Sequence, residues 1–281
     1  MKFAICQELF EDTPWDQQCD IIADVGYTGI EVAPFTIAED LASVSDATLG
    51  GIRQTANSAG LEVIGLHWLL AKTDGLHLTS ADPNVRKTTT EYLKLLARTC
   101  GMLGGKVLVF GSPPQRTLPP QMTMQDGLKY ATEVFQNAMP EFAAHGVQLC
   151  MEPLTAKETD FINTCDDAVQ LMNKVDHPAF VLHQDVKAML GAERDSIPEL
   201  IHRHASVCGH FHVNDINLLG PGMGETDFHP IFEALLEVQY QGWVSVEVFD
   251  YSPGAKKIAK KSLQYMRSVL SDVEGAKDTL K

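Results

Sequence analysis

One stretch of the chain reads Gly209-His210-Phe211-His212-Val213-Asn214-Asp215 and continues to the loop Gly220-Pro221-Gly222-Met223-Gly224. Side chains alternate between the two faces of a β-strand, so the two histidines and the asparagine share one face, and the phenylalanine and valine share the other. The glycines and the proline predict a loop directly afterwards. Such a strand fits the mouth of a barrel enzyme, although two histidines satisfied within a core would give the same pattern.

Short apolar runs alternate with helical patterns along the whole chain, which predicts βαβ units and a parallel sheet. Eight such units favour a closed (β/α)8 TIM barrel over an open doubly wound sheet, which usually shows a Gly-rich phosphate turn after its first strand. No GxGxxG or GxxxxGK[ST] motif occurs. We expect a single domain over residues 1–281, with residues 275–281 as a flexible tail. The predicted strands are Phe3–Cys6, Gly29–Ala33, Glu62–His67, Val107–Phe110, Val147–Glu152, Phe180–Asp185, Val207–Val213 and Val244–Phe249.

The composition is that of an ordinary globular protein, with 44% hydrophobic and 21% charged residues. The formal net charge of −15 argues against a nucleic-acid partner, because binding to phosphates needs a basic surface. The six cysteines show no metal-type spacing, and no apolar run is long enough to cross a membrane. These features predict a cytoplasmic protein with reduced cysteines, no membrane contact and a small-molecule partner.

The last four predicted strands become polar at their C-terminal ends, on the face that points into the barrel. Buried charges must be paired or must coordinate a cation, and three carboxylates cannot pair with one another. A divalent metal resolves this conflict, and one histidine with three carboxylates suits Mn²⁺ or Mg²⁺ best, with Co²⁺ or Zn²⁺ as alternatives. Ordinary ion pairs with a base such as Lys187 remain the other explanation. The four residues are Glu152, Asp185, His212 and Glu247.

Other polar residues are predicted to lie near the same mouth. The loops Leu69–Asp82 and Gly111–Met122 are long, and such loops at a barrel rim usually build the binding surface. His67 ends the third strand and is expected to bind a substrate hydroxyl. His183 lies on the inward face of the sixth strand, one layer deeper. Lys187 follows that strand and either binds substrate oxygens or is an ordinary rim lysine.

These residues carry a resemblance to the xylose-isomerase-like TIM barrels, a superfamily of sugar-phosphate isomerases and epimerases, ketose 3-epimerases and endonuclease-IV-type enzymes. The likeness runs from Gly26-Tyr27-Thr28-Gly29-Ile30-Glu31 to Trp243-Val244-Ser245-Val246-Glu247. It implies that one metal is held by the ends of strands five to eight, and it assigns the histidine ligand to His212 and a packing role to His210. The full ligand set that it implies is Glu152, Asp185, His212 and Glu247.

The resemblance to ketose 3-epimerases also implies that Glu158 grips the carbonyl end of the substrate. The chain departs from that pattern at two positions: Ala188 stands where the family often has histidine, and Leu218 stands where the epimerases have arginine. Both family residues contact substrate, so the departures leave the substrate open and the metal site intact.

The implied function is that of a metal-dependent sugar or sugar-phosphate isomerase or epimerase. It would move a proton at the carbon next to a carbonyl through a metal-stabilised enediolate, with Glu152 and Glu247 as the acid and base. The same enolate chemistry would suit a keto-sugar lyase or dehydratase. An endonuclease-IV-type metal nuclease and a non-catalytic sugar-binding barrel are the remaining alternatives. The family likeness also suggests a homo-oligomer.

Overall fold

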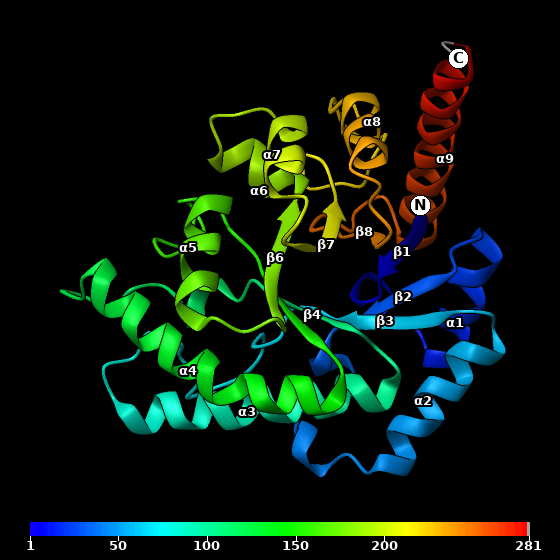
Figure 1. The fold of residues 1–281 in the computed structure, drawn as a ribbon. Helices are drawn as coiled ribbons and strands as arrows, with labels where there is room; N and C mark the ends of the chain where they lie inside the picture. Colours follow the sequence, from blue (N-terminus) through cyan, green and yellow to red (C-terminus); the bar gives the residue numbers. More distant parts are fainter. Residues whose placement is uncertain (280–281) are drawn as a thin grey trace.

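Within residues 1–279, the part of the chain that the computed structural model describes, eight parallel strands close into one barrel in sequence order (Figure 1). Each predicted strand overlaps one of them, and the prediction of a single (β/α)8 barrel is confirmed. The last strand ends earlier than predicted, so Glu247 lies one residue beyond it. The strands are β1 (Lys2–Cys6), β2 (Gly29–Val32), β3 (Glu62–Leu66), β4 (Val107–Phe110), β5 (Gln148–Met151), β6 (Phe180–Asp185), β7 (Cys208–Val213) and β8 (Trp243–Val246).

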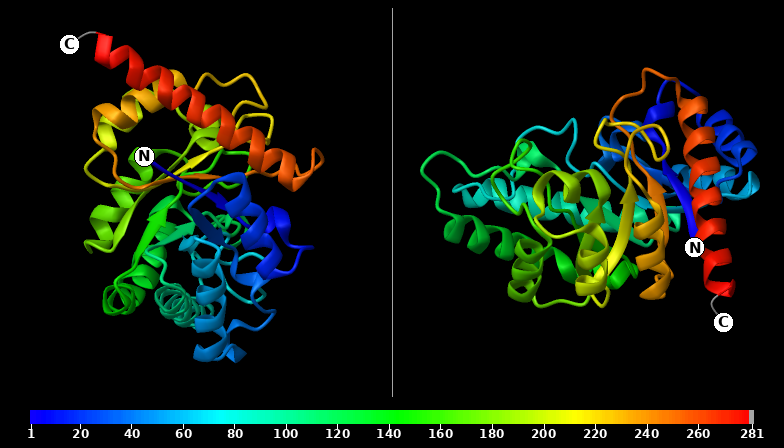
Figure 2. Two further views of the ribbon diagram at one scale, coloured as in Figure 1. Left: turned by 90° about the vertical axis from the view of Figure 1, so that its right-hand side faces the viewer. Right: turned by 90° about the horizontal axis from the view of Figure 1, so that it is seen from above.

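The helices surround the barrel, as the two views of Figure 2 show, and α3 and α4 lie side by side along it. Their apolar sides pack on the outward faces of the strands and form the main core. The α-helices of the described residues are α1 (Trp15–Val25), α2 (Asp46–Ser58), α3 (Pro83–Leu103), α4 (Met124–His145), α5 (Cys165–Val175), α6 (Val186–Ala192), α7 (Ile197–His204), α8 (His229–Glu237) and α9 (Ala255–Thr279).

Capping residues explain where several of these helices begin. Thr164 and Ser196 each form a capping box with the acidic residue three positions later. Pro14 is the N-cap of α1 and not its first helical residue, because its ψ of 144° is extended. Helix α9 continues to Thr279, through part of the expected tail, and residues 280–281 lie outside the described part.

A small apolar layer closes the barrel interior beneath the mouth. Val107 and Val109 from β4 pack there with Cys150 from β5 and Val181 from β6. Because these side chains fill the interior, the barrel is no pore, and the polar groups at the C-terminal strand ends lie on a packed floor.

The sequence predicts reduced cysteines and no membrane-spanning segment. All six cysteines are free thiols. Among residues 1–279, no helix is both long enough and apolar enough to cross a membrane.

Candidate active site

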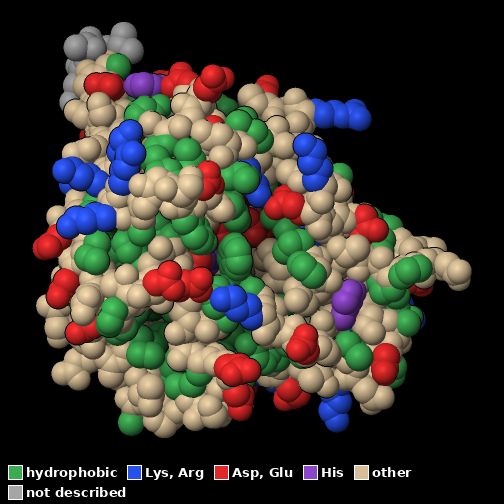
Figure 3. Space-filling model, turned by 180° about the vertical axis from the view of Figure 1, so that it is seen from behind, with side chains coloured by type: hydrophobic (Ala, Val, Ile, Leu, Met, Phe, Trp, Pro, Cys, Tyr) green, Lys and Arg blue, Asp and Glu red, His purple; other side chains and the backbone are tan. Residues whose placement is uncertain are grey.

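A cavity of about 440 Å³ opens at the C-terminal end of the barrel. Figure 3 shows a hollowed face of the molecule, with acidic side chains inside the hollow and apolar ones around it. Both loops that were expected to build a binding surface contribute to the wall. Its lining residues are Trp68, Ala71, Lys72, Val109, Gly111, Ser112, Pro113, Pro114, Gln115, Glu152, Leu154, Glu158, Glu247 and Phe249.

Four buried side chains at the ends of β5, β6 and β7 form a group that suits a metal ion. Glu152, His183, Asp185 and His212 each offer one donor atom, and these atoms lie within 4.8 Å of one another. Neither ring nitrogen of His183 has a hydrogen-bond partner, although the side chain is completely buried. An unsatisfied buried imidazole is costly, and a cation would use one of its nitrogens. Mixed carboxylate and imidazole donors fit a divalent ion of the Mn²⁺, Co²⁺ or Zn²⁺ type, and carboxylates fit Mg²⁺.

Glu247 lies beside this group but makes different contacts. One of its carboxylate oxygens, Oε1, accepts a hydrogen bond from Trp68 Nε1 at 2.8 Å, and the other, Oε2, lies 3.2 Å from His212 Nδ1. Compared with the set predicted from the sequence, the tight group therefore contains His183 in place of Glu247. The role of Glu247 as a ligand remains a prediction.

The orientation of His212 is set from behind by Glu31 at the end of β2. Glu31 Oε2 lies 3.1 Å from His212 Nε2 and 2.9 Å from His210 Nε2. Holding Nε2 leaves Nδ1 facing Glu247, which is the carboxylate–histidine arrangement that orients metal ligands. Burial disfavours the charged His212 ring, but Glu31 and Glu247 outweigh burial and raise its pKa well above the ordinary value. Glu31 is fully buried, so it lies behind the cavity and not at its rim.

The carboxylate of Asp185 is held by a backbone N–H at the start of α6 and by the side chain of the residue that follows β7. Its Oδ1 accepts from the backbone N–H of Ala188, which makes Asp185 the N-cap of α6. Its Oδ2 accepts from Nδ2 of Asn214, at 2.6 Å. Burial, followed by the nearby charge of Glu247, raises the pKa of Asp185 to about 6. The sequence did not reveal α6, because this helix has only seven residues.

Arg116, a completely buried residue of the β4–α4 loop, holds the backbone around Glu152. Its Nη1 donates to the Glu152 carbonyl oxygen at 2.6 Å, and its Nη2 donates to the Ile162 carbonyl oxygen at 3.0 Å. The guanidinium therefore ties the β4–α4 loop to the loop that follows β5. No spacing or motif in the sequence distinguishes Arg116, so it was missed.

The pKa values of Glu152 and Glu247 are shifted in opposite directions. Burial, Glu247 and Asp185 raise the pKa of Glu152 well above its ordinary value. Burial would also raise the pKa of Glu247, but His212 and His67 hold it below its ordinary value. One cavity thus contains two carboxyls whose pKa values are pushed apart, which is the pattern of an acid–base pair.

The residues predicted to bind substrate lie in three different places. Glu158 lines the cavity, and its Oε1 accepts from Lys187 Nζ at 2.8 Å. Lys187 is mostly buried, with Nζ 4.2 Å from the centre of the Phe249 ring. His67 is fully buried, with Nδ1 3.3 Å from Glu247 Oε1 and Nε2 in an ion-pair contact with a glutamate of the β1–α1 segment. In this geometry His67 contacts Glu247 and does not line the cavity, and His183 belongs to the ligand group beneath it.

Comparison with known proteins agrees with this geometry. The sequence profile of the xylose isomerase-like TIM barrel family matches residues 19–269, and the chain belongs to this family. D-psicose 3-epimerase of Ruminiclostridium cellulolyticum is 29% identical over 239 residues, covering 81% of this chain and 76% of that protein. The 3-dehydro-D-guloside 4-epimerase of Escherichia coli is 28% identical over 154 residues, covering 54% of this chain and 58% of that protein. A solved structure of L-ribulose 3-epimerase superimposes with a TM-score of 0.87 at 19% identity, covering 100% of this chain and 98% of the other, and supports the fold. With relatives of this kind, the chain is an enzyme of the isomerase and epimerase class.

Proposed function

We propose that this enzyme is a divalent-metal-dependent isomerase or epimerase of keto sugars, which moves a proton at the carbon next to the carbonyl. The observation that supports this best is the cavity itself, because Glu152 and Glu247 both line it and Glu152 also belongs to the group of buried ligand-type side chains. A divalent ion held by that group would polarise the substrate carbonyl as a Lewis acid.

Glu247 and Glu152 are suited to the two halves of a proton transfer. Burial and the neighbouring carboxylates raise the pKa of Glu152, while His212 and His67 lower the pKa of Glu247, so Glu247 is suited to accept the proton and Glu152 to return one. They follow β8 and β5, so they approach the cavity from separate strands of the closed barrel. Removal and return on different faces of the substrate gives epimerisation, whereas return at the neighbouring carbon gives isomerisation.

Two other features of the mouth support binding of a sugar. Trp68 and Phe249 stack with ring centres 6.3 Å apart and give the cavity an apolar wall that excludes water. The Lys187–Glu158 pair supplies a cation and a carboxylate beside that wall. The epimerases bind substrate oxygens with basic side chains at positions where this chain has Ala188 and the exposed Leu218. In this chain, Lys187 binds those oxygens instead.

The test is hydrogen exchange with solvent in deuterated water. The protein loaded with Mn²⁺ is incubated with D-psicose, D-fructose and L-ribulose, and proton NMR follows the hydrogens next to each carbonyl. We expect deuterium to enter at such a carbon in at least one sugar, with appearance of the epimer or isomer. Loss of water from the sugar would indicate a dehydratase instead. Absence of exchange in every sugar, with metal bound, would contradict the proposal.

A further inference from the structure

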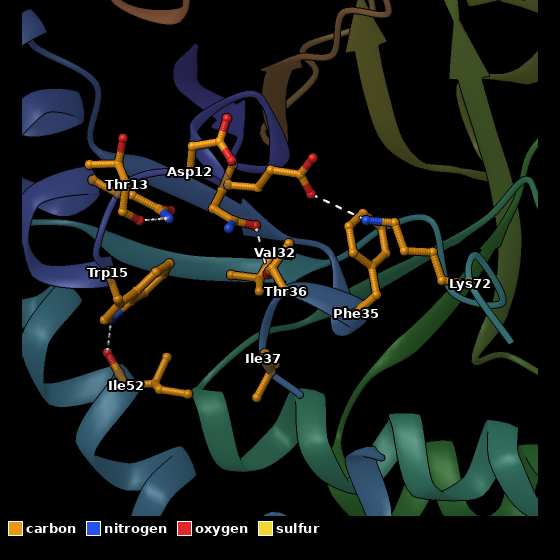
Figure 4. A pocket seen from close by; sticks show the side chains of 12 residues that line it. Asp12, Thr13, Trp15, Val32, Phe35, Thr36, Ile37, Ile52 and Lys72 are labelled. Atoms are coloured by element: carbon orange, nitrogen blue, oxygen red, sulfur yellow. Dashed lines mark hydrogen bonds and ion pairs between the residues drawn. The ribbon is translucent and has the colours of Figure 1, made fainter. Parts of the chain in front are cut away.

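A second cavity of about 470 Å³ lies beside the first, between the segments that follow β1 and β2, the start of α1 and the middle of α2 (Figure 4). We call it the rim cavity. It shares one lining residue, Lys72, with the cavity described above, and the proposed proton transfer makes no use of the others. The rim cavity is lined by Gln7, Glu11, Asp12, Thr13, Trp15, Gln18, Val32, Phe35, Thr36, Ile37, Ile52 and Lys72.

Two buried amides give the rim cavity fixed polar groups. Gln7 is 1% exposed, and its Oε1 accepts from Thr36 Oγ1 at 3.1 Å and from a backbone N–H. Gln18 is 4% exposed, and its Nε2 donates to the Thr13 carbonyl oxygen at 2.7 Å. The Oε1 of Gln18 has no hydrogen-bond partner. A buried acceptor left in this state is costly, and a small rotation of the Gln18 amide toward the cavity would let a ligand hydroxyl satisfy it.

Aromatic rings form two sides of the rim cavity. Trp15 and Phe35 lie on opposite sides, with Val32 and Thr36 between them (Figure 4). Trp15 Nε1 already donates to the Ile52 carbonyl oxygen at 3.0 Å, so the indole offers the cavity its ring and no free N–H. Apolar rings with a few fixed amides and hydroxyls are what a sugar ring requires, because its C–H face packs on aromatic rings while its hydroxyls need donors and acceptors.

The charge of the rim cavity selects among possible ligands. Glu11 and Asp12 line it with one cation, Lys72, which lies 3.3 Å from Glu11 Oε2 and above the Phe35 ring. The lining therefore has a formal excess of negative charge, which disfavours a phosphate or a carboxylate. An uncharged polyhydroxylated group fits this lining.

The wall between the two cavities is thin and contains a movable side chain. Phe35 of the rim cavity and Trp68 of the catalytic cavity have ring centres 6.1 Å apart. Lys72 lies against both cavities, and its side chain is 62% exposed. Exposed ion pairs such as Lys72–Glu11 are weak, so this lysine can move aside at little cost. A ligand bound in the catalytic cavity can then extend into the rim cavity.

We propose that the rim cavity is a subsite for a second, uncharged sugar ring of the substrate. The enzyme then acts on keto sugars that carry a glycosidic or similar ring, and not only on free ketoses. This substrate class rests on the proposed function, whereas binding of a sugar ring in the rim cavity does not.

The experiment compares two adjacent glutamines of α1. Gln18→Leu removes the buried amide at nearly the same volume, and Gln17→Leu is the control, because Gln17 is exposed and lies outside the rim cavity. Deuterium exchange is measured on D-fructose and on two ketose disaccharides, lactulose and isomaltulose. For Gln18→Leu, the ratio of kcat/KM for the better disaccharide to that for D-fructose should fall at least tenfold, and Gln17→Leu should leave the ratio unchanged.

Binding is tested separately by saturation-transfer NMR, with methyl β-D-glucopyranoside and methyl β-D-galactopyranoside as probes that have no ketone. We expect saturation of ring C–H protons, which is lost in Gln18→Leu and kept in Gln17→Leu. If no probe binds, or if both variants behave alike, the subsite is overturned. Exchange into D-fructose without exchange into either disaccharide would overturn the substrate class and leave the proposed function standing. Probe binding that depends on Gln18, without exchange in any sugar, would support the subsite and overturn the proposed function.

Discussion

Strands β5 to β8 and strands β1 to β4 end at the same mouth but supply different side chains there. The second half of the barrel carries the residues whose donor atoms converge, which are Glu152, His183, Asp185 and His212, and beside them Glu247. From the first half, Glu31 and His67 contact these residues from behind. The β4 side chains Val107 and Val109 supply only apolar floor.

The two halves of the barrel therefore have different expected roles: the second half supplies the reacting groups, and the first half holds those groups in position. The side chains of the second half named above face the cavity or the group of donor atoms, so under the proposed function their loss should remove a chemical step or a metal ligand. The buried residues of the first half fix the direction of those groups, and their loss should weaken the site in a graded way. The same half also holds the rim cavity, where we propose that a second sugar ring binds apart from the reacting carbons.

The largest effect is expected from removing either carboxylate of the acid–base pair. Glu247→Gln and Glu152→Gln keep the shape and an oxygen atom but remove the group that carries the proton. General acid–base groups contribute about 10²–10⁴-fold in rate, so kcat should fall by that range on any substrate found. The measurement is turnover at known metal content. If metal-loaded Glu247→Gln turned over like the wild type, the base would lie elsewhere, and Lys187 and Glu158 would be examined next.

The second prediction separates the two histidines of β7. His212→Ala should lower the bound metal below one ion per chain, because this residue belongs to the ligand group. His210→Ala should keep the metal and lower the free energy of unfolding by roughly 1–3 kcal/mol, because Glu31 loses a buried hydrogen bond. Metal analysis and urea unfolding measure the two effects. Full metal content in His212→Ala would show that the histidine ligand is misassigned.

Much of the difference between the two halves of the barrel could be predicted from the sequence. The alternation of strands and helices gave the barrel, and the two-residue period of β6 and β7 placed Asp185 and His212 correctly at the inward strand ends. Period alone could not decide whether His183 or Glu247 completes the tight group, because that depends on how side chains rotate across the barrel. Arg116 could not be predicted either, since its carbonyl partners come from a distant loop.

Arg116 joins the two halves, and its removal should have an intermediate effect. Arg116→Met leaves the buried carbonyl oxygens of Glu152 and Ile162 without their donors, and each orphaned group costs about 1–3 kcal/mol. Part of that cost is offset because a buried charge also disappears. We expect the free energy of unfolding to fall by roughly 2 kcal/mol in urea, with lower kcat. The exposed Arg194→Met is the control, and equal stability of the two variants would contradict the role of Arg116.

The smallest effect concerns the Lys187–Glu158 pair, which belongs to the second half but lies beside the ligand group and not within it. Burial would raise the pKa of Glu158, but the hydrogen bond and charge of Lys187 lower it below the ordinary value of 4.5. A group whose pKa is lower in the folded state stabilises the fold above its unfolded pKa and loses that contribution as the pH falls through its folded pKa. Glu158→Gln should therefore lower the free energy of unfolding at neutral pH by only about 0.5–1 kcal/mol, because the ion pair is partly exposed and glutamine can still accept the hydrogen bond. The difference from wild type should stay constant from pH 7 to about pH 5 and shrink below pH 4.5.

Urea unfolding across this pH range measures the difference in stability. The control is Glu62→Gln, because Glu62 is an exposed glutamate at the start of β3. A difference that persists unchanged well below pH 4 would show that Glu158 stabilises the fold by packing and not by its charge, and would remove the reason to assign Lys187 and Glu158 a joint role at the mouth.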